Sequence, residues 1–522
     1  MKSQHLIIIL VPILLQTSYP AFAGSTTIVQ PNFGIMPKIV GGTDAVVGNY
    51  PWMANLLIAS EPYGPKALSC GGSLIRPDVI LTAAHCLEPR NLGGLLQTQS
   101  AELEITVGAY DLRNITAQDR IGVKAIYQHL DYTSDPIMDN DIALIKLKTP
   151  VKNATLASIE PLLMQQVVHN DLLTVIGWGA LDGKSLVYPN ILQEVQVPYV
   201  NYTICNDALG GEVSSNSICA GFKSGGKDSC YGDSGGPLFY DYNGKNYQVG
   251  IVSWGYDCAA PNSYGVYTKV ANYTTWIADT TDQVNLSQDT NFGAQGVDID
   301  SVIQITAFNW SEDTKTIQSV SLTANSNYEI KTDTCSKRTL TANKACTLEI
   351  EFEPIQAVPS TANLTVTMKS GKTLTATLSG IGLALVDLNT AVDNTNINIY
   401  TGGTAMWSED TTVVGSVAGS ALVSGKVITG ETSYASTEVE GSGTLSFKWK
   451  KENQNVMNFN FVSVIIDRKI YSEQYDDFPW TTETITLGPG KHIITWVYAD
   501  YASTLVNSGA AWIDNVSWVK NP

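Results

Sequence analysis

Basic side chains are scarce in this sequence of 522 residues, which holds 31 Lys and Arg against 49 Asp and Glu. The formal net charge is −18, and no cluster of basic residues interrupts the acidic balance. Nucleic acids bind to clusters of Lys and Arg, so the composition argues against a nucleic-acid partner. An acidic surface instead favours the approach of basic substrates.

Long apolar runs are also missing. The run Leu6–Leu15 follows Lys2 and is about half as long as the ~20 residues that span a bilayer. Small residues flank the bulky one in Ala21-Phe22-Ala23, as at a signal-peptidase cleavage site. We therefore predict a signal peptide over residues 1–23, and a chain that is secreted to the extracellular space without a membrane span.

Cysteine pairs of the CxxC kind do not occur, which argues against a metal site and for disulfides in an exported chain. The count of eight cysteines is even, so we expect no free thiol. The cysteines are Cys70, Cys86, Cys205, Cys219, Cys230, Cys258, Cys335 and Cys346. Because six lie in the first half of the chain and two in the second, we predict three local bridges in the first half and one in the second.

A chain of this length is too long for one hydrophobic core, so roughly two to four domains are expected. Residues 39–280 contain short runs rich in Val, Ile, Leu and Thr, broken by Gly, Pro and Asn, which is typical of an all-β barrel or sandwich. One helix is predicted over Val270–Thr280. The predicted strands include Glu104–Val107, Ile142–Leu147, Leu173–Ile176 and Val249–Val252.

The rest of the chain is also rich in predicted strands. The polar stretch 280–290 is predicted to be a linker. Residues 291–383 then alternate apolar and polar side chains, as in Leu348–Phe352, which predicts half-buried strands in a small sandwich. A second polar span, Asn389–Asn398, precedes a last strand-rich region that ends in Ala511–Val516.

Among the few histidines, one stands out by its neighbours. A lone histidine is more often structural or exposed than catalytic, which is our interpretation of His129 and His169. His85 differs because Cys70 sits where a bridge to Cys86 would pin its segment and hold the imidazole in place. A disulfide over so short a loop stabilises by roughly 3 kcal/mol in the chain-entropy model.

An aspartate and a serine complete a catalytic pattern. Asp141 precedes the apolar run Ile142–Leu147 and is expected to lie buried beside the imidazole, where a carboxylate fixes the histidine tautomer and stabilises the imidazolium. Ser234 lies between glycines on a tight turn, where its hydroxyl can be approached closely. The backbone N–H groups of Gly232 and Ser234 can point at a developing oxyanion, and one such donor raises the rate by about two to three powers of ten.

These motifs closely resemble the chymotrypsin–trypsin family over residues 39 to about 279, in that family's order of His, Asp and Ser. The resemblance implies a double β-barrel with the active site in the cleft between the barrels. In that site His85 would be the general base, Asp141 its orienting partner and Ser234 the nucleophile. The resemblance also implies three bridges: Cys70–Cys86, Cys205–Cys219 and Cys230–Cys258.

The sequence Lys38-Ile39-Val40-Gly41-Gly42 resembles the activation site of the same family. Cleavage after Lys38 would free the amino group of Ile39, which inserts and pairs with Asp233, so residues 24–38 would be a propeptide. Removing one partner of such a buried pair typically costs ~3–5 kcal/mol, so we expect the uncut chain to be nearly inactive. The activating partner is either another protease or, because Lys38 fits the expected specificity, the protein itself.

Asp228 matches the carboxylate at the floor of the primary specificity pocket in trypsin-like members. A poorly solvated carboxylate there demands a cation, so the resemblance implies cleavage after Arg or Lys in protein or peptide substrates. Gly255, which follows Ser253 and Trp254, and Gly265 match the two glycines that keep the pocket open to long side chains.

Two positions depart from the family pattern. Asp257 stands where relatives usually have Gly at the pocket rim, and it either adds to the preference for cations or narrows the entrance. Tyr264 stands where digestive trypsins have Pro; in relatives a tyrosine there is compatible with a sodium site, so a sodium effect near Tyr264 is an alternative to the absence of any cofactor. The loop Tyr110–Asp119 lacks the paired Glu ligands of trypsin's calcium site, so no metal site is predicted.

The second half of the chain carries two further resemblances. Residues 291–383 resemble an immunoglobulin-like sandwich of bacterial secreted proteins, on the motifs Asn291-Phe292-Gly293 and Leu378–Gly382, and imply a structural bridge Cys335–Cys346. Residues 388–522 resemble a jelly-roll module that follows catalytic domains in exported bacterial enzymes. We expect the aromatic residues of this module to be core rather than a sugar-stacking face: Trp407, Trp480, Trp496 and Trp518. His492 is either a hydrogen-bonded strand residue or part of a site.

The predicted function is that of a secreted trypsin-like serine endopeptidase made as a zymogen, with two accessory β domains that dock it to a surface or substrate. The alternative is an adhesin or glycan-binding protein in which the C-terminal modules carry the main role. The complete triad, pocket and activation site argue against the alternative, since a binding protein needs none of the three.

Overall fold

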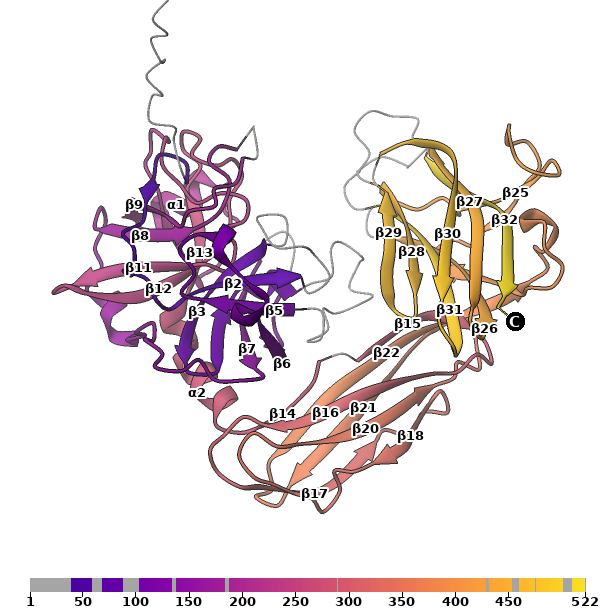
Figure 1. Cartoon of the computed structure of the whole chain (residues 1–522), viewed down its shortest axis with the longest axis horizontal. Helices are drawn as coiled ribbons and strands as arrows, with labels where there is room; N and C mark the ends of the chain where they lie inside the picture. The colour runs from indigo at the N-terminus through magenta and orange to yellow at the C-terminus, as the bar shows by residue number, and fades with distance from the viewer. Residues whose placement is uncertain are drawn as a thin grey trace, which may run out of the picture. The chain divides into compact units, whose positions relative to one another are not determined.

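The computed structural model describes residues 39–58, 68–87, 103–133, 138–183, 187–288, 290–428, 431–452, 460–474, 476–500 and 509–521. The predicted signal peptide and propeptide, Lys38 included, lie outside these residues. Strands dominate this part of the chain and form two closed barrels followed by two β-sandwiches (Figure 1). The predicted all-β fold class is confirmed.

The first barrel is closed by antiparallel pairing of six strands. Its interior is filled by aliphatic side chains from facing strands, such as Leu56, Ile80, Ile105 and Ile145, all fully buried. Closure removes the open edges that a flat sheet of this composition would expose. The strands follow one another around the barrel as β2 (Met53–Ile58), β3 (Leu68–Arg76), β4 (Val79–Thr82), β7 (Ala143–Leu147), β6 (Ile121–Gln128) and β5 (Leu103–Val107).

The second barrel closes where its first two long strands, β8 (Leu172–Gly177) and β9 (Gln193–Val200), pair with each other. A short strand, β1 (Thr43–Asp44), is added outside the ring on β9. The core combines Val175, Val197, Leu238 and Tyr267. The other four strands are β10 (Ser217–Ala220), β13 (Gly265–Lys269), β12 (Lys245–Trp254) and β11 (Pro237–Tyr242), in that order.

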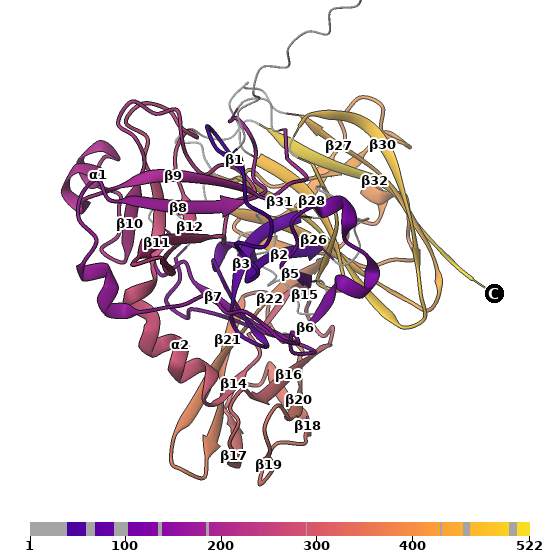
Figure 2. The same cartoon turned by 60° about the vertical axis from the view of Figure 1, so that its left-hand side comes forward.

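Helices are short in the described part of the chain, and none is long and apolar enough to cross a membrane. The predicted helix over Val270–Thr280 begins as a 3-10 turn, η7 (Val270–Tyr273), and continues as α2 (Thr274–Thr281), which leads out of the second barrel (Figure 2). Helix α1 (Tyr202–Ala208) is absent from the predicted elements and is capped by the Asn201 side chain. The other 3-10 turns are η2 (His85–Leu87), η4 (Leu112–Asn114), η5 (Ala117–Asp119), η6 (Pro161–Gln165) and η8 (Thr390–Val392).

The middle module, residues 284–386, is a sandwich whose two sheets enclose Phe292, Leu348, Phe352 and Leu364. A disulfide, Cys335–Cys346, links its strands as predicted. One sheet has the order β14 (Val284–Leu286), β16 (Ser301–Asn309), β20 (Ala345–Phe352) and β18 (Tyr328–Asp333); the other has β19 (Thr339–Leu340), β17 (Lys315–Leu322), β21 (Pro359–Met368) and β22 (Thr373–Val386), with β15 (Asn291–Gly296) parallel to β22.

The prediction of a linker over residues 280–290 is wrong for Val284–Leu286. These three residues form β14, pair with β16 and are buried. The polar residue among them is accommodated because the Asn285 amide donates to the carbonyl of Thr280 at 2.7 Å. We use "linker" below for residues 282–290, which contain this strand.

The C-terminal module, residues 388–521, is a second sandwich, reached when β22 leaves β21 and pairs with β23. Its core includes Trp449, Trp496, Phe447 and Ile513. One sheet has the order β23 (Ile399–Gly403), β26 (Thr432–Glu440), β31 (Lys491–Asp500), β28 (Asn460–Ile466) and β29 (Lys469–Gln474); the other has β24 (Ser408–Asp410), β25 (Ala421–Val423), β32 (Ala510–Lys520), β27 (Gly443–Glu452) and β30 (Phe478–Leu487).

The tryptophans of this module do not share one exposed face. Trp407 and Trp496 are 2% and 0% exposed and belong to the core, as expected, whereas Trp480 and Trp518 are half-buried. His492 is a hydrogen-bonded strand residue, with its Nδ1 2.7 Å from Asp467 Oδ2 and its Nε2 3.0 Å from the carbonyl of Gly488.

Candidate active site

His85 and Asp141 meet at the start of η2 in the first barrel. The Nδ1 atom of His85 lies 2.7 Å from Asp141 Oδ2, and the backbone N–H of His85 donates to Asp141 Oδ1 at 2.9 Å. The two carboxylate oxygens thus hold both the ring and the backbone of one residue. Because Nδ1 must carry a proton to donate to a carboxylate, Nε2 is left as the basic nitrogen of the ring.

The carboxylate of Asp141 is fully buried, yet it is kept ionised. Burial alone would raise the pKa of Asp141, but the charge of His85 and hydrogen bonds from His85 and Ser253 outweigh this effect and lower the pKa. The Ser253 hydroxyl donates to Asp141 Oδ2 at 2.5 Å, and Thr268 Oγ1 donates to the Asp141 carbonyl at 2.6 Å. The second barrel therefore supplies two of the groups that hold Asp141.

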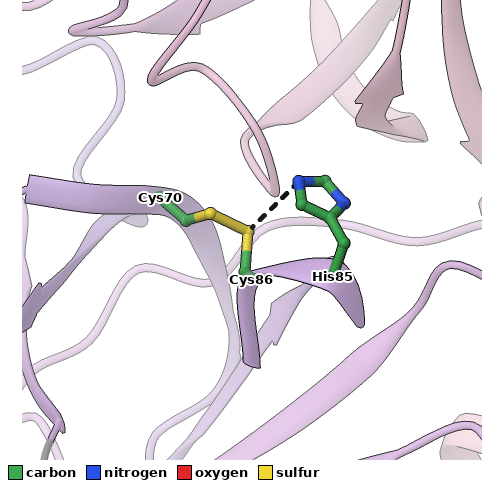
Figure 3. A group of neighbouring side chains, drawn as sticks. All are labelled: Cys70, His85 and Cys86. Carbon is green, nitrogen blue, oxygen red and sulfur yellow. Dashed lines mark hydrogen bonds between the residues drawn. A yellow bond between two sulfur atoms is a disulfide. The ribbon is translucent and has the colours of Figure 1, made fainter. Parts of the chain in front are cut away.

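The disulfide Cys70–Cys86 lies beside the imidazole, as Figure 3 shows. It ties η2 to β3, and Cys86 Sγ is 3.8 Å from His85 Nε2. Cys70, His85 and Cys86 bring together three side chains of metal-binding types. Both sulfurs are bonded to each other, however, so neither is a thiolate that could bind a metal. The bridge fixes the His85 segment, as predicted.

The turn that carries Ser234 packs directly on this disulfide. Gly235 has φ +75°, and a Cβ added there would lie 2.3 Å from Thr82 Oγ1 and 3.0 Å from Cys86 Sγ. The backbone N–H of Gly71 donates to the carbonyl of Ser234 at 2.7 Å. Only glycine fits at this close approach between the turn and the His85 segment. The structure therefore brings Ser234 and the His85–Asp141 pair to one place between the barrels.

Gly232 adopts a left-handed conformation with φ +92°, two residues before Ser234. Backbone N–H groups on both sides of a left-handed residue can converge on one point, as an oxyanion requires. The turn is held by Asp233, whose Oδ1 accepts from Gly179 N at 2.8 Å and whose Oδ2 accepts from Cys230 N at 2.9 Å. This arrangement can stabilise a tetrahedral intermediate formed on Ser234.

Asp228 lies in the loop between β10 and β11 of the second barrel and is 5% exposed. Its Oδ2 accepts from Ala259 N at 3.0 Å, whereas its Oδ1 is buried and has no hydrogen-bond partner in the described part of the chain. Burial raises the pKa of Asp228 to about 7. A cation brought next to Oδ1 would satisfy this oxygen and restore the charge.

Of the residues predicted to border the specificity pocket, Gly265 lies next to Asp228. A Cβ at Gly265 would meet Asp228 Oδ1 at 2.8 Å, so a side chain there would block the carboxylate. At Gly255 an added Cβ would make ordinary van der Waals contact, since its nearest neighbour is the Tyr264 carbonyl oxygen at 3.8 Å. Trp254 is half-buried beside it, and the disulfide Cys230–Cys258 closes the pocket loop. The third predicted bridge of this domain, Cys205–Cys219, is also present.

Of the two positions that depart from the family pattern, one is exposed and the other is buried. Asp257 is exposed, and its backbone N–H donates to Ser263 Oγ at 3.2 Å. Tyr264 is 4% exposed and packs against the space that a Cβ of Gly221 would fill.

Ile39 is completely buried in the core of the second barrel. Its φ of +31° is an outlier for a β-branched residue. The carbonyl of the next residue, Val40, accepts from the backbone N–H of Asp228 at 3.1 Å. The start of the described chain is therefore in contact with the floor of the pocket. Asp233 is fully buried, and burial raises its pKa to about 7.

A family model described as Trypsin matches residues 39–277. Trypsin-3 of Salmo salar is 38% identical over 237 residues, which cover 45% of this chain and 93% of that protein. This chain belongs to the trypsin family. Trypsin of Sus scrofa is 35% identical to this chain over 245 residues, which cover 47% of this chain and 95% of that protein. The protein is therefore a serine endopeptidase of the trypsin-like kind.

Two solved structures extend the likeness of this trypsin-family protein beyond the barrels. The secreted serine protease VesC from Vibrio cholerae has a TM-score of 0.57 over 92% of this chain and 99% of that chain, at 23% identity, which shows the shared fold. The VesB protease of Vibrio cholerae has a TM-score of 0.53 over 66% of this chain and 100% of that chain, at 26% identity.

Other residues of the site carry no sequence signal. Thr268 holds the Asp141 backbone, and Ser253, predicted only as part of the pocket, also donates to the Asp141 carboxylate. Gln128, a buried residue at the end of β6, donates through its side chain to the carbonyl of Ala84 at 2.9 Å. These contacts join segments far apart in the chain, so no local pattern points to them.

Proposed function

We propose that this protein is an exported zymogen which, once cut between Lys38 and Ile39, hydrolyses peptide bonds that follow Arg or Lys. His85 acts as general base, Asp141 orients it, and Ser234 attacks the scissile carbonyl while Gly232 N and Ser234 N stabilise the oxyanion. His85 returns the proton taken from Ser234 to the departing amine, which leaves the acyl group on Ser234, and water activated through His85 then releases the acyl group.

The specificity rests on one observation, the buried Asp228 carboxylate whose Oδ1 has no partner among the described residues. A neutral substrate side chain would leave this oxygen desolvated and unpaired, whereas the cation of Arg or Lys pairs with it. The missing side chain at Gly265 keeps the space beside Asp228 Oδ1 clear, because an added Cβ would lie 2.8 Å from that oxygen. These features support a preference for basic residues before the scissile bond.

The activation step is supported by Ile39 and Asp233. Ile39 is buried with an unfavourable φ, and cleavage before it would release that restraint. The new ammonium group would pair with the Asp233 carboxylate, whose burial raises its pKa and favours such a counter-charge. Asp233 in turn holds Gly179 N and Cys230 N beside the oxyanion turn.

The test uses the full-length chain and its Ser234→Ala variant, each cut at Lys38 by a trace of a second protease. Chromogenic peptides ending in Arg, Lys, Phe or Ala then report the specificity. Hydrolysis of the Arg and Lys peptides only after cleavage, and its loss in Ser234→Ala, is the expected result. Hydrolysis of the Phe or Ala peptides instead would show that Asp228 does not govern the pocket.

A further inference from the structure

The free edge of strand β6 near the catalytic histidine is covered by a residue of the linker. β6 pairs with β7 up to Gln128, but with β5 only at Ile121 and Gly122. At the uncovered end, the backbone N–H of Gln128 donates to Gln288 Oε1 at 2.6 Å, and Gln288 Nε2 donates to the Gln128 carbonyl at 2.9 Å. The carboxamide of Gln288 thus takes the place of a neighbouring strand.

The residue held in this way reaches the catalytic segment through its own side chain. The Gln128 side chain is 8% exposed, and its Nε2 donates to the Ala84 carbonyl at 2.9 Å. The same carbonyl accepts from Leu87 N, also at 2.9 Å, and so closes the 3-10 turn that contains His85. Gln288, Gln128 and Ala84 therefore form a continuous chain of hydrogen bonds that ends next to His85.

A hydrophobic cluster also joins the middle module to the first barrel. Phe308 and Trp310 of the middle module lie in one hydrophobic cluster with Ala83 and Ile142. Ile142 directly follows Asp141, and Ala83 precedes the His85 segment. All four residues are at most 2% exposed. The two aromatic rings face β6 and β7, since Lys124 Nζ lies 4.5 Å from the ring centroid of Phe308 and Lys146 Nζ lies 5.8 Å from that of Trp310. Contacts from outside residues 39–277 therefore reach the two strands that lie beside the segment of Asp141.

We propose that Gln288 and Gln128 are positioning residues for His85, so that the linker and middle module form part of the working catalytic centre rather than an appended accessory. The inference rests on the proposed role of His85. A shift of the Ala84 carbonyl would move the turn that carries the imidazole, and small misplacements of a catalytic base are costly because proton transfer requires close alignment.

Gln288→Ala tests this in the full-length chain after cleavage at Lys38. We expect kcat for an Arg peptide to fall on the order of tenfold, while KM and the Kd of benzamidine, which binds at Asp228 and does not need His85, stay within about twofold. Gln283→Ala is the matched control: it is a glutamine of the same linker, but its side chain bonds to Lys372 and Asn285. We expect the control to keep the parent kcat.

Gln128→Met keeps the side-chain length and removes the donor to Ala84. If both residues position His85 through the same hydrogen bonds, their effects are coupled and do not add. The double variant Gln128→Met/Gln288→Ala then has about the kcat of the less active single variant. Unchanged kcat in Gln288→Ala, or a kcat loss matched by equal losses of benzamidine binding and thermal stability, would overturn the proposal. A parent chain inactive on every peptide would instead refute the proposed function itself.

Discussion

At the scale of single residues, Asp228 has the clearest chemical consequence. One of its oxygens is held by Ala259 N, and the other is buried without a partner in the described residues. Burial without a partner destabilises the ionised carboxylate in the empty site, and a cationic side chain would compensate for this cost. The substrate preference therefore follows from the desolvation of a single group.

Replacing this carboxylate should abolish the preference. In Asp228→Asn we expect kcat/KM for Arg and Lys peptides to fall by about 10²- to 10⁴-fold, the equivalent of roughly 3–5 kcal/mol for removing one partner of a buried ion pair. Phe and Ala peptides should gain relative to Arg. Steady-state kinetics with matched peptides measure both effects, and an Arg preference that survives the substitution would exclude Asp228 as its source.

Binding of benzamidine, a planar cation, should depend on pH through the same group. Because the pKa of Asp228 is raised from 3.8 to about 7, the folded protein holds a proton there that the unfolded chain has lost. The contribution of Asp228 to the stability of the empty protein therefore falls as the pH rises from about 4 to 7. The cation binds the ionised form, so its Kd at pH 5 should be about 100-fold weaker than at pH 8.

Titration calorimetry of the His85→Ala variant measures the Kd of benzamidine at each pH without a contribution from the protonation of the His85 imidazole. Asp228→Asn in the same background should bind weakly and show no such pH dependence. An affinity that stays constant between pH 5 and pH 8 would mean that Asp228 is already ionised in the empty pocket.

At the scale of elements, the site depends on the close packing of the Ser234 turn against η2 and β3. Gly235 has φ +75°, and an added Cβ would meet Thr82 Oγ1, the Gly71 carbonyl and Cys86 Sγ within 3.0 Å. Gly48 has a similar φ of +83° with nothing within 4 Å of the added atom. The two glycines therefore separate the cost of backbone conformation from the cost of a clash.

We expect Gly48→Ala to destabilise by about 1–2 kcal/mol, the cost of a left-handed conformation for a residue with a Cβ. Gly235→Ala should destabilise by roughly 3–5 kcal/mol, because overpacking adds to that cost, and should lose most activity. Denaturant unfolding and peptide hydrolysis of both variants test this. Equal stability of the two variants would show that the turn can move away from the disulfide.

The strands and bridges could be predicted from sequence because their signals are local. The run Ile142–Leu147 coincides with β7 (Ala143–Leu147) to within one residue. The spacing of the cysteines indicates bridges between near neighbours, and the four disulfides pair as the family resemblances imply. Strand β14 escaped prediction because its three residues sit in a polar stretch and are buried only by pairing with β16. The Gln288–Gln128 contact joins residues 160 positions apart, so only the folded chain reveals it.

At the scale of the whole molecule, the barrels contain the triad and pocket residues, but they do not stand alone. Gln288, Phe308 and Trp310 lie beyond the residues that match the trypsin family model, yet Gln288 bonds to Gln128 of β6, and the two aromatic residues share a hydrophobic cluster with residues of the first barrel. The fold of VesC covers 92% of this chain, so the likeness in fold extends past the barrels into the sandwiches.

The most direct test of a cation-specific, cleavage-activated serine nucleophile is an active-site titration with p-nitrophenyl 4-guanidinobenzoate. This ester delivers a guanidinium-bearing acyl group to the nucleophile and releases p-nitrophenol once per acylated site. We predict a burst of about one equivalent after cleavage at Lys38, and none from the uncut chain, Ser234→Ala or Asp228→Asn. A full burst from the uncut chain, or none after cleavage, would contradict the account.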